Sequence, residues 1–233
     1  MSKRAVILAG GKGTRLKPYT IAMPKPLVPI GTTPILEIII KQLINCGFDH
    51  ITLSVNHMAE FIKAFFGDGS RWNIKIDYSL EEKPLSTMGP LHLIPDLPDN
   101  FLVMNGDVLT DIKFGEFLDK HISAKNIFTI SSYQRVVKND YGVLDINEKN
   151  QLIAFREKPE TKFDVSMGVY AVSKDVLEII PKNTFYGFDT LMLDLIATKK
   201  LPSTIVHPGY WLDIGRPEDY ERAINEFENL NLI

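Results

Sequence analysis

LAGGKGTRLKPYTIAMPK, residues 8–25, follows the short apolar run Ala5–Leu8 near the N-terminus. An apolar run of this kind is typical of a buried strand. The loop behind it contains three glycines, Gly10, Gly11 and Gly13. Glycines let the backbone approach a ligand and uncover successive N–H groups, and Arg15 and Lys25 add a planar cation and a compact one. A strand, a glycine loop and two cations together favour a site for a polyphosphate.

Two well-known phosphate loops do not fit these residues. A P-loop requires Gly, four residues, Gly, Lys and then Ser or Thr, and no such string occurs in the chain. The dinucleotide fingerprint requires a third glycine where this chain has Leu16, and Pro18 would interrupt the helix that must follow. A plain turn would explain the glycines but not the later segment Pro24–Pro26. We therefore interpret the stretch as a phosphate loop of another type.

The composition is that of an ordinary globular chain. Its 233 residues are 45% hydrophobic and 24% charged, which suffices for one domain with a sizeable core. A net charge of −3 gives no general attraction to nucleic acid or to anionic membranes. One cysteine, Cys46, excludes an internal disulfide, and the apolar run before Gly10 is too short for a signal peptide or a transmembrane helix. We expect a cytoplasmic protein without nucleic-acid or membrane partners.

Strand and helix patterns alternate through the first half of the chain. Apolar strand-like runs lie at 5–8, 50–55, 74–80, 101–104 and 127–133, and helical patterns lie at 34–46, 58–66 and 114–122. Thr32 and Thr33 can cap the first helix at Pro34. This order predicts an α/β fold, a Rossmann-like mixed sheet that is mostly parallel and flanked by helices.

The pattern changes near Tyr141. Tyr141–Ile146 and Leu152–Phe155 flank a turn-rich segment and predict a small antiparallel hairpin. Further strands are expected at 165–172, 203–207 and 210–215, and helices at 174–180, 188–199 and from 217 onward. Because no repeat or linker divides the chain, we expect one domain over residues 1–233.

Two carboxylates stand out from this pattern. Asp107 follows the apolar run 101–104, and ligands in α/β sheets gather beyond the carboxyl ends of the strands, so Asp107 should lie beside the glycine loop. Asp213 is framed by Trp211, Leu212 and Ile214, and a carboxylate among apolar residues needs a partner. The five histidines lack metal-ligand spacing, so we interpret them as structural or surface residues.

The segment from Leu8 to Ile30 resembles the signature of the sugar-1-phosphate nucleotidyltransferases. Further matches follow in the family's order, NGD at 105–107, YGV at 141–143, EKP at 157–159, a glycine-containing strand at 166–170 and WLDIG at 211–215. The resemblance implies a nucleotide-binding half over about 1–135 and a sugar-phosphate-binding half, with the hairpin, over about 136–233. It also implies an enzyme that joins a nucleoside triphosphate to a sugar 1-phosphate and releases pyrophosphate.

The resemblance further implies roles for single residues. The catalytic residues would be Arg15 and Lys25, which hold the triphosphate, and Asp107 and Asp213, which hold Mg²⁺. The nucleotide would contact Leu8, Ala9, Gly10, Gly11, Gly13, Thr14, Arg15, Gly89 and Asp107. The sugar phosphate would contact Gly142, Glu157, Lys158, Ser166 and Gly168.

The chemistry of such a transfer requires no general base. A sugar phosphate is largely a dianion at neutral pH, since the second pKa of such esters is about 6. The protein then has to position the reactants and neutralise charge, and Mg²⁺ typically takes one or two carboxylates plus substrate phosphates. We expect in-line attack of the sugar-phosphate oxygen on the α-phosphorus.

The chain departs from the family pattern at two places. Ser86 and Met88 stand where relatives commonly have Gly and Ala, which affects the loop expected around the base. Ser166 and Met167 stand where relatives usually have Asn and Ala, and a serine hydroxyl offers fewer hydrogen bonds to a sugar than an amide.

The resemblance leaves the base, the sugar and the assembly open. The Gly89–Leu91 segment and the short chain resemble guanylyltransferases for mannose-, heptose- or glucosamine-type 1-phosphates, so GTP is favoured over UTP, dTTP and CTP. A non-catalytic regulatory subunit that binds nucleotide sugars is the alternative class. Since the chain ends at Ile233, soon after the last helical pattern, we expect no C-terminal β-helix. A homo-oligomer is compatible with the pattern.

Overall fold

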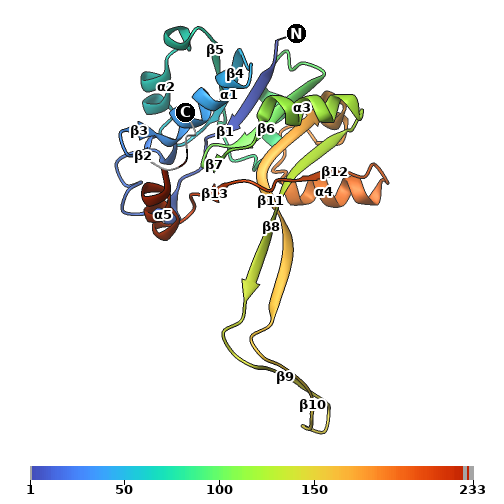
Figure 1. The fold of residues 1–233 in the computed structure, drawn as a ribbon. Coiled ribbons are helices and arrows are strands. Elements are labelled where there is room, and N and C mark those ends of the chain that lie inside the picture. Colours follow the sequence, from blue (N-terminus) through green and yellow to red (C-terminus); the bar gives the residue numbers. More distant parts are fainter. Residues whose placement is uncertain (1, 228–229, 231–233) are drawn as a thin grey trace.

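A seven-stranded sheet forms the centre of the computed structural model, which describes residues 2–227 and 230 (Figure 1). In spatial order its strands are β12 (Ser203–Val206), β8 (Phe128–Lys138), β11 (Glu160–Ser173), β6 (Asn100–Asn105), β1 (Arg4–Leu8), β4 (His50–Val55) and β5 (Lys75–Leu80). All neighbouring strands pair in parallel except β11, which is antiparallel to both β6 and β8. The prediction of a mixed, mostly parallel sheet is confirmed.

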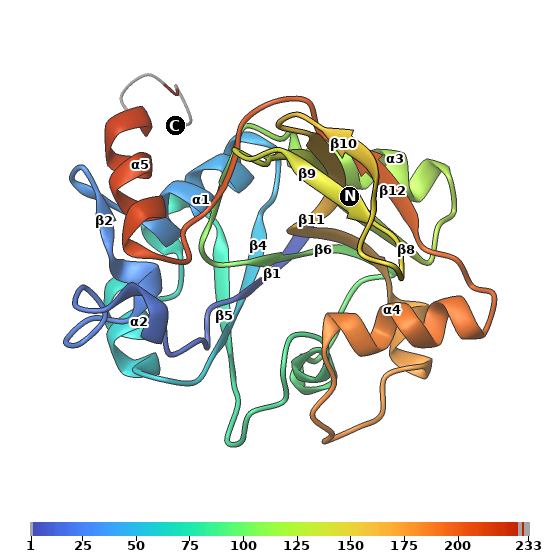
Figure 2. The ribbon, with the colours of Figure 1, turned by 90° about the horizontal axis from the view of Figure 1, so that it is seen from below.

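Helices cover both faces of this sheet, as predicted. They are α1 (Ile35–Asn45), α2 (Ala59–Phe66), α3 (Phe114–Ser123), α4 (Phe188–Ala197) and α5 (Pro217–Phe227). Alternate residues of β1 separate two cores, because side chains of a strand alternate between its faces. Ile7 packs in one core with α1, α2, α3 and α5, whereas Val6 packs in the other with α4. The view from below shows α4 and α5 at opposite sides of the sheet (Figure 2). Among the described residues, no helix has the length and apolar character needed to cross a membrane.

The first helix begins differently from the expectation. Thr33 pairs with Ile30, so that β2 (Pro29–Ile30) and β3 (Thr33–Pro34) form a two-residue ladder directly before α1. Pro34 is the N-cap, and no side chain caps the helix. The predicted threonine cap is therefore wrong, because the backbone of this segment belongs to the ladder and places Ile35 N–H on the carbonyl of Val28 at 3.1 Å.

The strands β8 and β11 extend well beyond the sheet, farther than the pattern predicts. They pair continuously from Ser132–Ser166 out to Lys138–Glu160, and the segment that connects them contains the predicted hairpin, β9 (Val143–Ile146) with β10 (Leu152–Arg156). Figure 1 shows this ribbon and hairpin projecting from the body; we call residues 133–165 the arm. The expected border between the two halves, at about residue 135, falls inside β8 at the root of the arm.

The buried His121 on α3 gives a prediction for stability. Its Nδ1 lies 2.8 Å from Thr129 Oγ1, and burial lowers the pKa of the imidazole from its ordinary value of 6.5 to about 4. Between pH 4 and pH 6.5, His121 is protonated in the unfolded chain but neutral in the folded chain. The free energy of unfolding should therefore fall by up to about 3 kcal/mol as the pH drops from 6.5 to 4.

Urea unfolding of the wild type and of His121→Gln at about pH 7.5 and about pH 4.5 checks this contribution. Glutamine can retain a hydrogen bond to Thr129 but does not titrate, so the variant should lose less stability on acidification than the wild type. Equal losses in the two proteins would contradict a neutral, buried His121.

Candidate active site

The two predicted carboxylates meet at the carboxyl edge of the sheet. Asp107 lies in the two-residue turn between β6 and β7 (Val108–Thr110), and Asp213 ends β13 (Trp211–Asp213), which pairs antiparallel with β7. The register places Asp213 opposite Val108, and the N–H of Ile214 donates to the carbonyl of Asp107 at 3.0 Å. This backbone pairing holds the carboxylates side by side although they are far apart in the sequence.

Lys25 supplies the nearest cation. It opens the short 3₁₀ helix Lys25–Leu27, is nearly buried, and forms an ion pair from Nζ to Asp107 Oδ2. The glycine loop wraps closely around it. Gly13 has φ +60, and a Cβ there would lie 3.1 Å from the Cβ of Lys25 and 3.0 Å from a methyl of Thr20. A larger residue at Gly13 would therefore displace the lysine from the carboxylates.

Lys25 does not fully balance the negative charges of Asp107 and Asp213. Burial and the neighbouring charge of Asp107 raise the pKa of Asp213, and Lys25 and Arg15 only partly oppose them. The second oxygen of Asp107, Oδ1, is buried without a hydrogen-bond partner among the described residues. Both observations fit a divalent cation with two carboxylate ligands. Mg²⁺ commonly binds in this way, with phosphate and water as its other ligands.

A cavity of about 650 Å³ opens beside Asp213. Its lining is rich in arginines, namely Arg15, Arg135, Arg216 and Arg222, with Asp213 and Asp219 as the carboxylates. The indole of Trp211 forms part of the wall and packs against the ring of Tyr133, with the ring centres 5.3 Å apart and the planes tilted by 39°. A cavity with this lining suits an anionic ligand of substantial size. The sequence patterns did not single out Arg135, Arg216 or Arg222, because surface arginines are common and only the fold gathers these three.

The first part of the glycine loop crosses the sheet edge between β4 and β6. The carbonyl of Leu8 accepts from Gly106 N–H at 3.0 Å, and Ala9 N–H donates to Ser54 at 2.8 Å. At Gly10, a Cβ would lie 3.3 Å from Glu81 Oε1. The sequence patterns did not indicate Glu81 as a candidate site residue. It follows β5 directly, so the rule that ligands gather beyond the carboxyl ends of the strands, which was applied to Asp107, could have indicated it too.

The loop before Gly89 accommodates its departures from the family pattern. Ser86 adopts φ +65, the left-handed region that glycine favours, and Met88 is fully buried in the core beneath α4. Gly89 is buried too, and its N–H donates to the carbonyl of Tyr186 at 3.0 Å. The Met88 side chain is thus taken up by the core, and Ser86 itself adopts the backbone conformation that a glycine would favour.

Ser166 and Gly168 follow the arm in β11, and Gly168 lies beside Asn105 at the end of β6. Gly168 has φ +74, and a Cβ there would lie 2.6 Å from Nδ2 of Asn105, two residues before Asp107. Ser166 Oγ accepts from Gly168 N–H at 3.2 Å and donates to the hydroxyl of Tyr170 at 3.1 Å. The serine hydroxyl is thus engaged within its own strand.

The other three residues expected at the sugar phosphate lie elsewhere. Gly142, Glu157 and Lys158 are all exposed on the outer half of the arm, and none of them lines the cavity beside Asp213. Lys158 lies just beyond the outermost β8–β11 pair, Lys138–Glu160, and has φ +43. Within a single chain, the fold therefore unites Arg15, Lys25, Asp107 and Asp213 but leaves these three residues outside the site.

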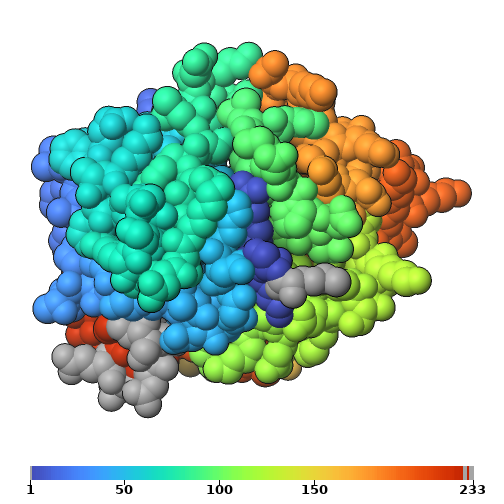
Figure 3. Space-filling model, turned by 90° about the horizontal axis from the view of Figure 1, so that it is seen from above, coloured from blue at the N-terminus to red at the C-terminus, as the bar shows by residue number. Residues whose placement is uncertain are grey.

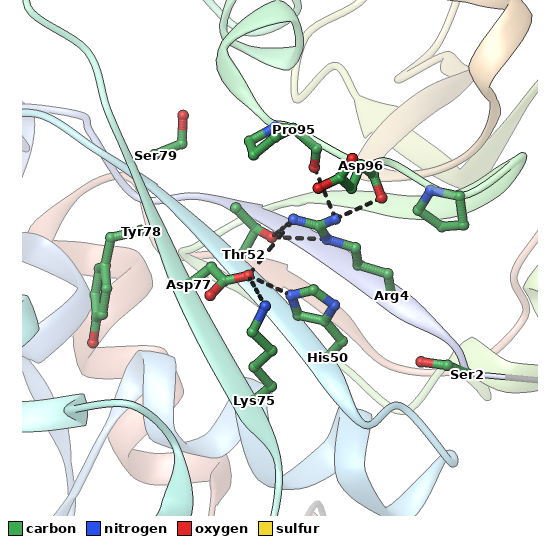
Figure 4. Close-up of a pocket in the computed structure, with 11 residues that line it drawn as sticks. Ser2, Arg4, His50, Thr52, Lys75, Asp77, Tyr78, Ser79, Pro95 and Asp96 are labelled. Atoms are coloured by element: carbon green, nitrogen blue, oxygen red, sulfur yellow. Dashed lines mark hydrogen bonds and ion pairs between the residues drawn. The ribbon is translucent and has the colours of Figure 1, made fainter.

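A second cavity, of about 590 Å³, lies at the opposite end of the sheet (Figure 4). Arg4, His50 and Lys75 line it, and each stands at the start of its strand. Figure 3 views this end, where the start of β1, in dark blue, lies between the cyan and green segments. The guanidinium of Arg4 already donates to Thr52 Oγ1 and to the carbonyls of Pro95 and Asp96. This arginine therefore serves the packing of strand and loop.

Comparisons with known proteins agree with the site at the carboxyl edge. Residues 4–229 match the family described as Nucleotidyl transferase. A UTP–glucose-1-phosphate uridylyltransferase from Synechocystis is 32% identical over 95% of the chain, which spans only 62% of that relative's length. A D-glycero-alpha-D-manno-heptose 1-phosphate guanylyltransferase from Aneurinibacillus thermoaerophilus is 30% identical, with 97% of this chain and 98% of the relative covered.

A solved structure shows the same agreement in three dimensions. HddC from Yersinia pseudotuberculosis, complexed with GMP-PN, has a TM-score of 0.71 and 29% identity, covering 97% of this chain and 99% of that one. The sequence motifs, the site that they form and the similarity to known proteins all indicate the same family. The chain belongs to the nucleotidyl transferase family.

Proposed function

We propose that this protein transfers a nucleotidyl group from a nucleoside triphosphate, preferably GTP, to a sugar 1-phosphate and releases pyrophosphate. The observation that carries the proposal is the meeting of Lys25, Asp107 and Asp213 at one sheet edge beside an arginine-lined cavity. GTP is favoured because the relative of nearly equal length is a guanylyltransferase and the similar solved structure binds a guanine nucleotide analogue. UTP, dTTP and CTP are the alternatives.

On the nucleotide side, Arg15 and Lys25 bind the triphosphate and stabilise the negative charge that develops during transfer. Asp107 and Asp213 hold Mg²⁺, which neutralises phosphate oxygens when it is bound. The backbone of the glycine loop, over Leu8–Thr14, faces the nucleotide together with the loop that ends at Gly89. Glu81 lies next to Gly10, where its carboxylate can accept hydrogen bonds from the N–H groups of a guanine edge.

On the sugar side, Ser166 and Gly168 border the reacting centre, and Glu157, Lys158 and Gly142 bind the sugar phosphate from the arm. The attacking oxygen belongs to a phosphate that is already ionised at neutral pH, so the protein positions it rather than deprotonating it. The protein works in the cytoplasm as one domain, with its nucleotide-binding half over about residues 1–135 and its sugar-phosphate-binding half over about residues 136–233.

A panel of the four triphosphates with mannose, heptose, glucosamine and glucose 1-phosphates, in the presence of Mg²⁺, tests the proposal. We expect release of pyrophosphate, fastest with GTP. Arg15→Gln, Asp107→Asn and Asp213→Asn should each lower kcat by at least about 100-fold, as expected for loss of a group that stabilises transition-state charge. Asp175→Asn, an exposed carboxylate near the start of a remote 3₁₀ helix, is the matched control and should react at the wild-type rate.

Two outcomes would contradict the proposal. Absence of pyrophosphate release in every combination would favour the alternative of a regulatory subunit that binds nucleotide sugars without turnover. Near-normal rates in the Asp107 or Asp213 variant would exclude that carboxylate from the metal site.

A second prediction concerns Gly168, whose missing side chain makes room for Asn105. Gly168→Ala should raise KM for the sugar 1-phosphate and lower the free energy of unfolding by about 1–3 kcal/mol, through backbone strain and the clash with Asn105. Gly31→Ala is the matched control, because Gly31 has φ +59 but no atom within 4 Å of an added Cβ. Urea unfolding and KM measurements on both variants separate the two causes. Equal effects in both would show that the Asn105 contact has no role.

A further inference from the structure

The arm exposes an unusual amount of apolar surface. Among its exposed apolar side chains are Val136, Val137, Leu144, Ile153, Phe155 and Phe163, with exposed fractions from 40% to 66%. Val136 and Val137 are consecutive in β8 and must point to opposite faces of the ribbon. Both faces are thus open to solvent. Monomeric proteins seldom gather this many exposed apolar side chains on one projecting element, which favours packing of the arm against another surface.

The arm cannot reach its own site while its strands stay paired. The β8–β11 pairing runs without interruption from Ser132–Ser166 to Lys138–Glu160, and six residues of extended strand span about 20 Å. The root of the arm is held by the contact of Tyr133 with Trp211 and by the hydrogen bond that Trp211 Nε1 donates to the carbonyl of Met167, at 3.0 Å. Lys158 lies beyond the outer end of this paired segment.

The charge of the arm suits association with an identical copy. Between residues 134 and 164 the sequence contains six Lys or Arg and six Asp or Glu, so two arms or an arm and a nearly neutral body do not repel each other. The site beside Asp213 meanwhile lacks the groups on the arm that the sugar phosphate requires. A second copy of this chain provides both a cover for the apolar surface and those missing groups.

We propose that two copies exchange arms, so that Glu157 and Lys158 of each copy complete the sugar-phosphate side of the other copy's Asp107–Asp213 site. The proposal rests on the proposed function for the identity of the ligand. Exchange between identical chains is reciprocal, because a two-fold axis makes each arm–body contact occur twice. Each dimer then contains two composite sites, and the single chain contains none.

Subunit complementation tests the exchange directly. Asp107→Asn removes the body side of a site and Lys158→Ala removes its arm side, so each variant alone should be inactive. The two variants are co-expressed with different tags, and the heterodimer is isolated by sequential affinity steps. With exchanged arms, one of its two sites is intact, so it should regain about half of the wild-type rate. A heterodimer as inactive as its parents would show that each arm serves its own body and would overturn the proposal.

Sedimentation of the wild type and of arm variants gives a measurement that does not depend on activity. The wild type should sediment as a dimer, and Leu144→Asp with Ile153→Asp should sediment as a folded monomer because a charge is placed in the covered surface. Leu193→Asp on α4 is the matched control, since Leu193 is 68% exposed but lies outside the arm, and it should remain dimeric.

A fully active wild-type monomer would overturn the arm exchange while leaving the proposed function intact. A dimer that depends on the arm but releases no pyrophosphate with any substrate would instead overturn the proposed function and leave the exchange standing.

Discussion

The charge balance among Lys25, Asp107 and Asp213 is the constraint on which the rest of the structure depends. Two neighbouring, largely buried carboxylates repel each other, and burial already raises the pKa of Asp213. The fold keeps them together through the β7–β13 ladder and places Lys25, which stands between Pro24 and Pro26 at the start of a 3₁₀ helix, against Asp107. The remaining need for positive charge agrees with the metal ion that is proposed for this edge of the sheet.

Much of the fold outside the arm could be predicted from the sequence, because the sequence patterns of its strands are local and the position of Asp107 follows from sheet geometry. The strands β1, β4 and β6 are short apolar runs, and the carboxyl-end rule placed Asp107 beside the glycine loop. The departures at Ser86 and Met88 could not be judged in this way. Only the structure shows that Ser86 takes the left-handed conformation itself and that Met88 turns into the core.

The hairpin at the end of the arm was predicted from the pattern, but the projection of the arm away from the sheet was not. Apolar residues such as Val136 and Phe155 look like core positions in a strand, and periodicity does not reveal what a strand packs against. In the structure they are exposed, and the motif residues Glu157 and Lys158 lie with them, away from the carboxylates. An arm that meets a second copy reconciles the motif order with this distance, and it makes catalysis depend on assembly.

The central claim, that Asp107 and Asp213 hold the metal ion that binds the triphosphate, is tested most directly by calorimetry. Binding of a non-hydrolysable GTP analogue is measured with and without Mg²⁺, in the wild type and in Asp213→Asn. We expect Mg²⁺ to tighten binding at least about tenfold in the wild type, which corresponds to about 1.4 kcal/mol. The variant should lose this tightening and keep a metal-free affinity at or above that of the wild type. An equal effect of Mg²⁺ in both proteins would contradict the claim.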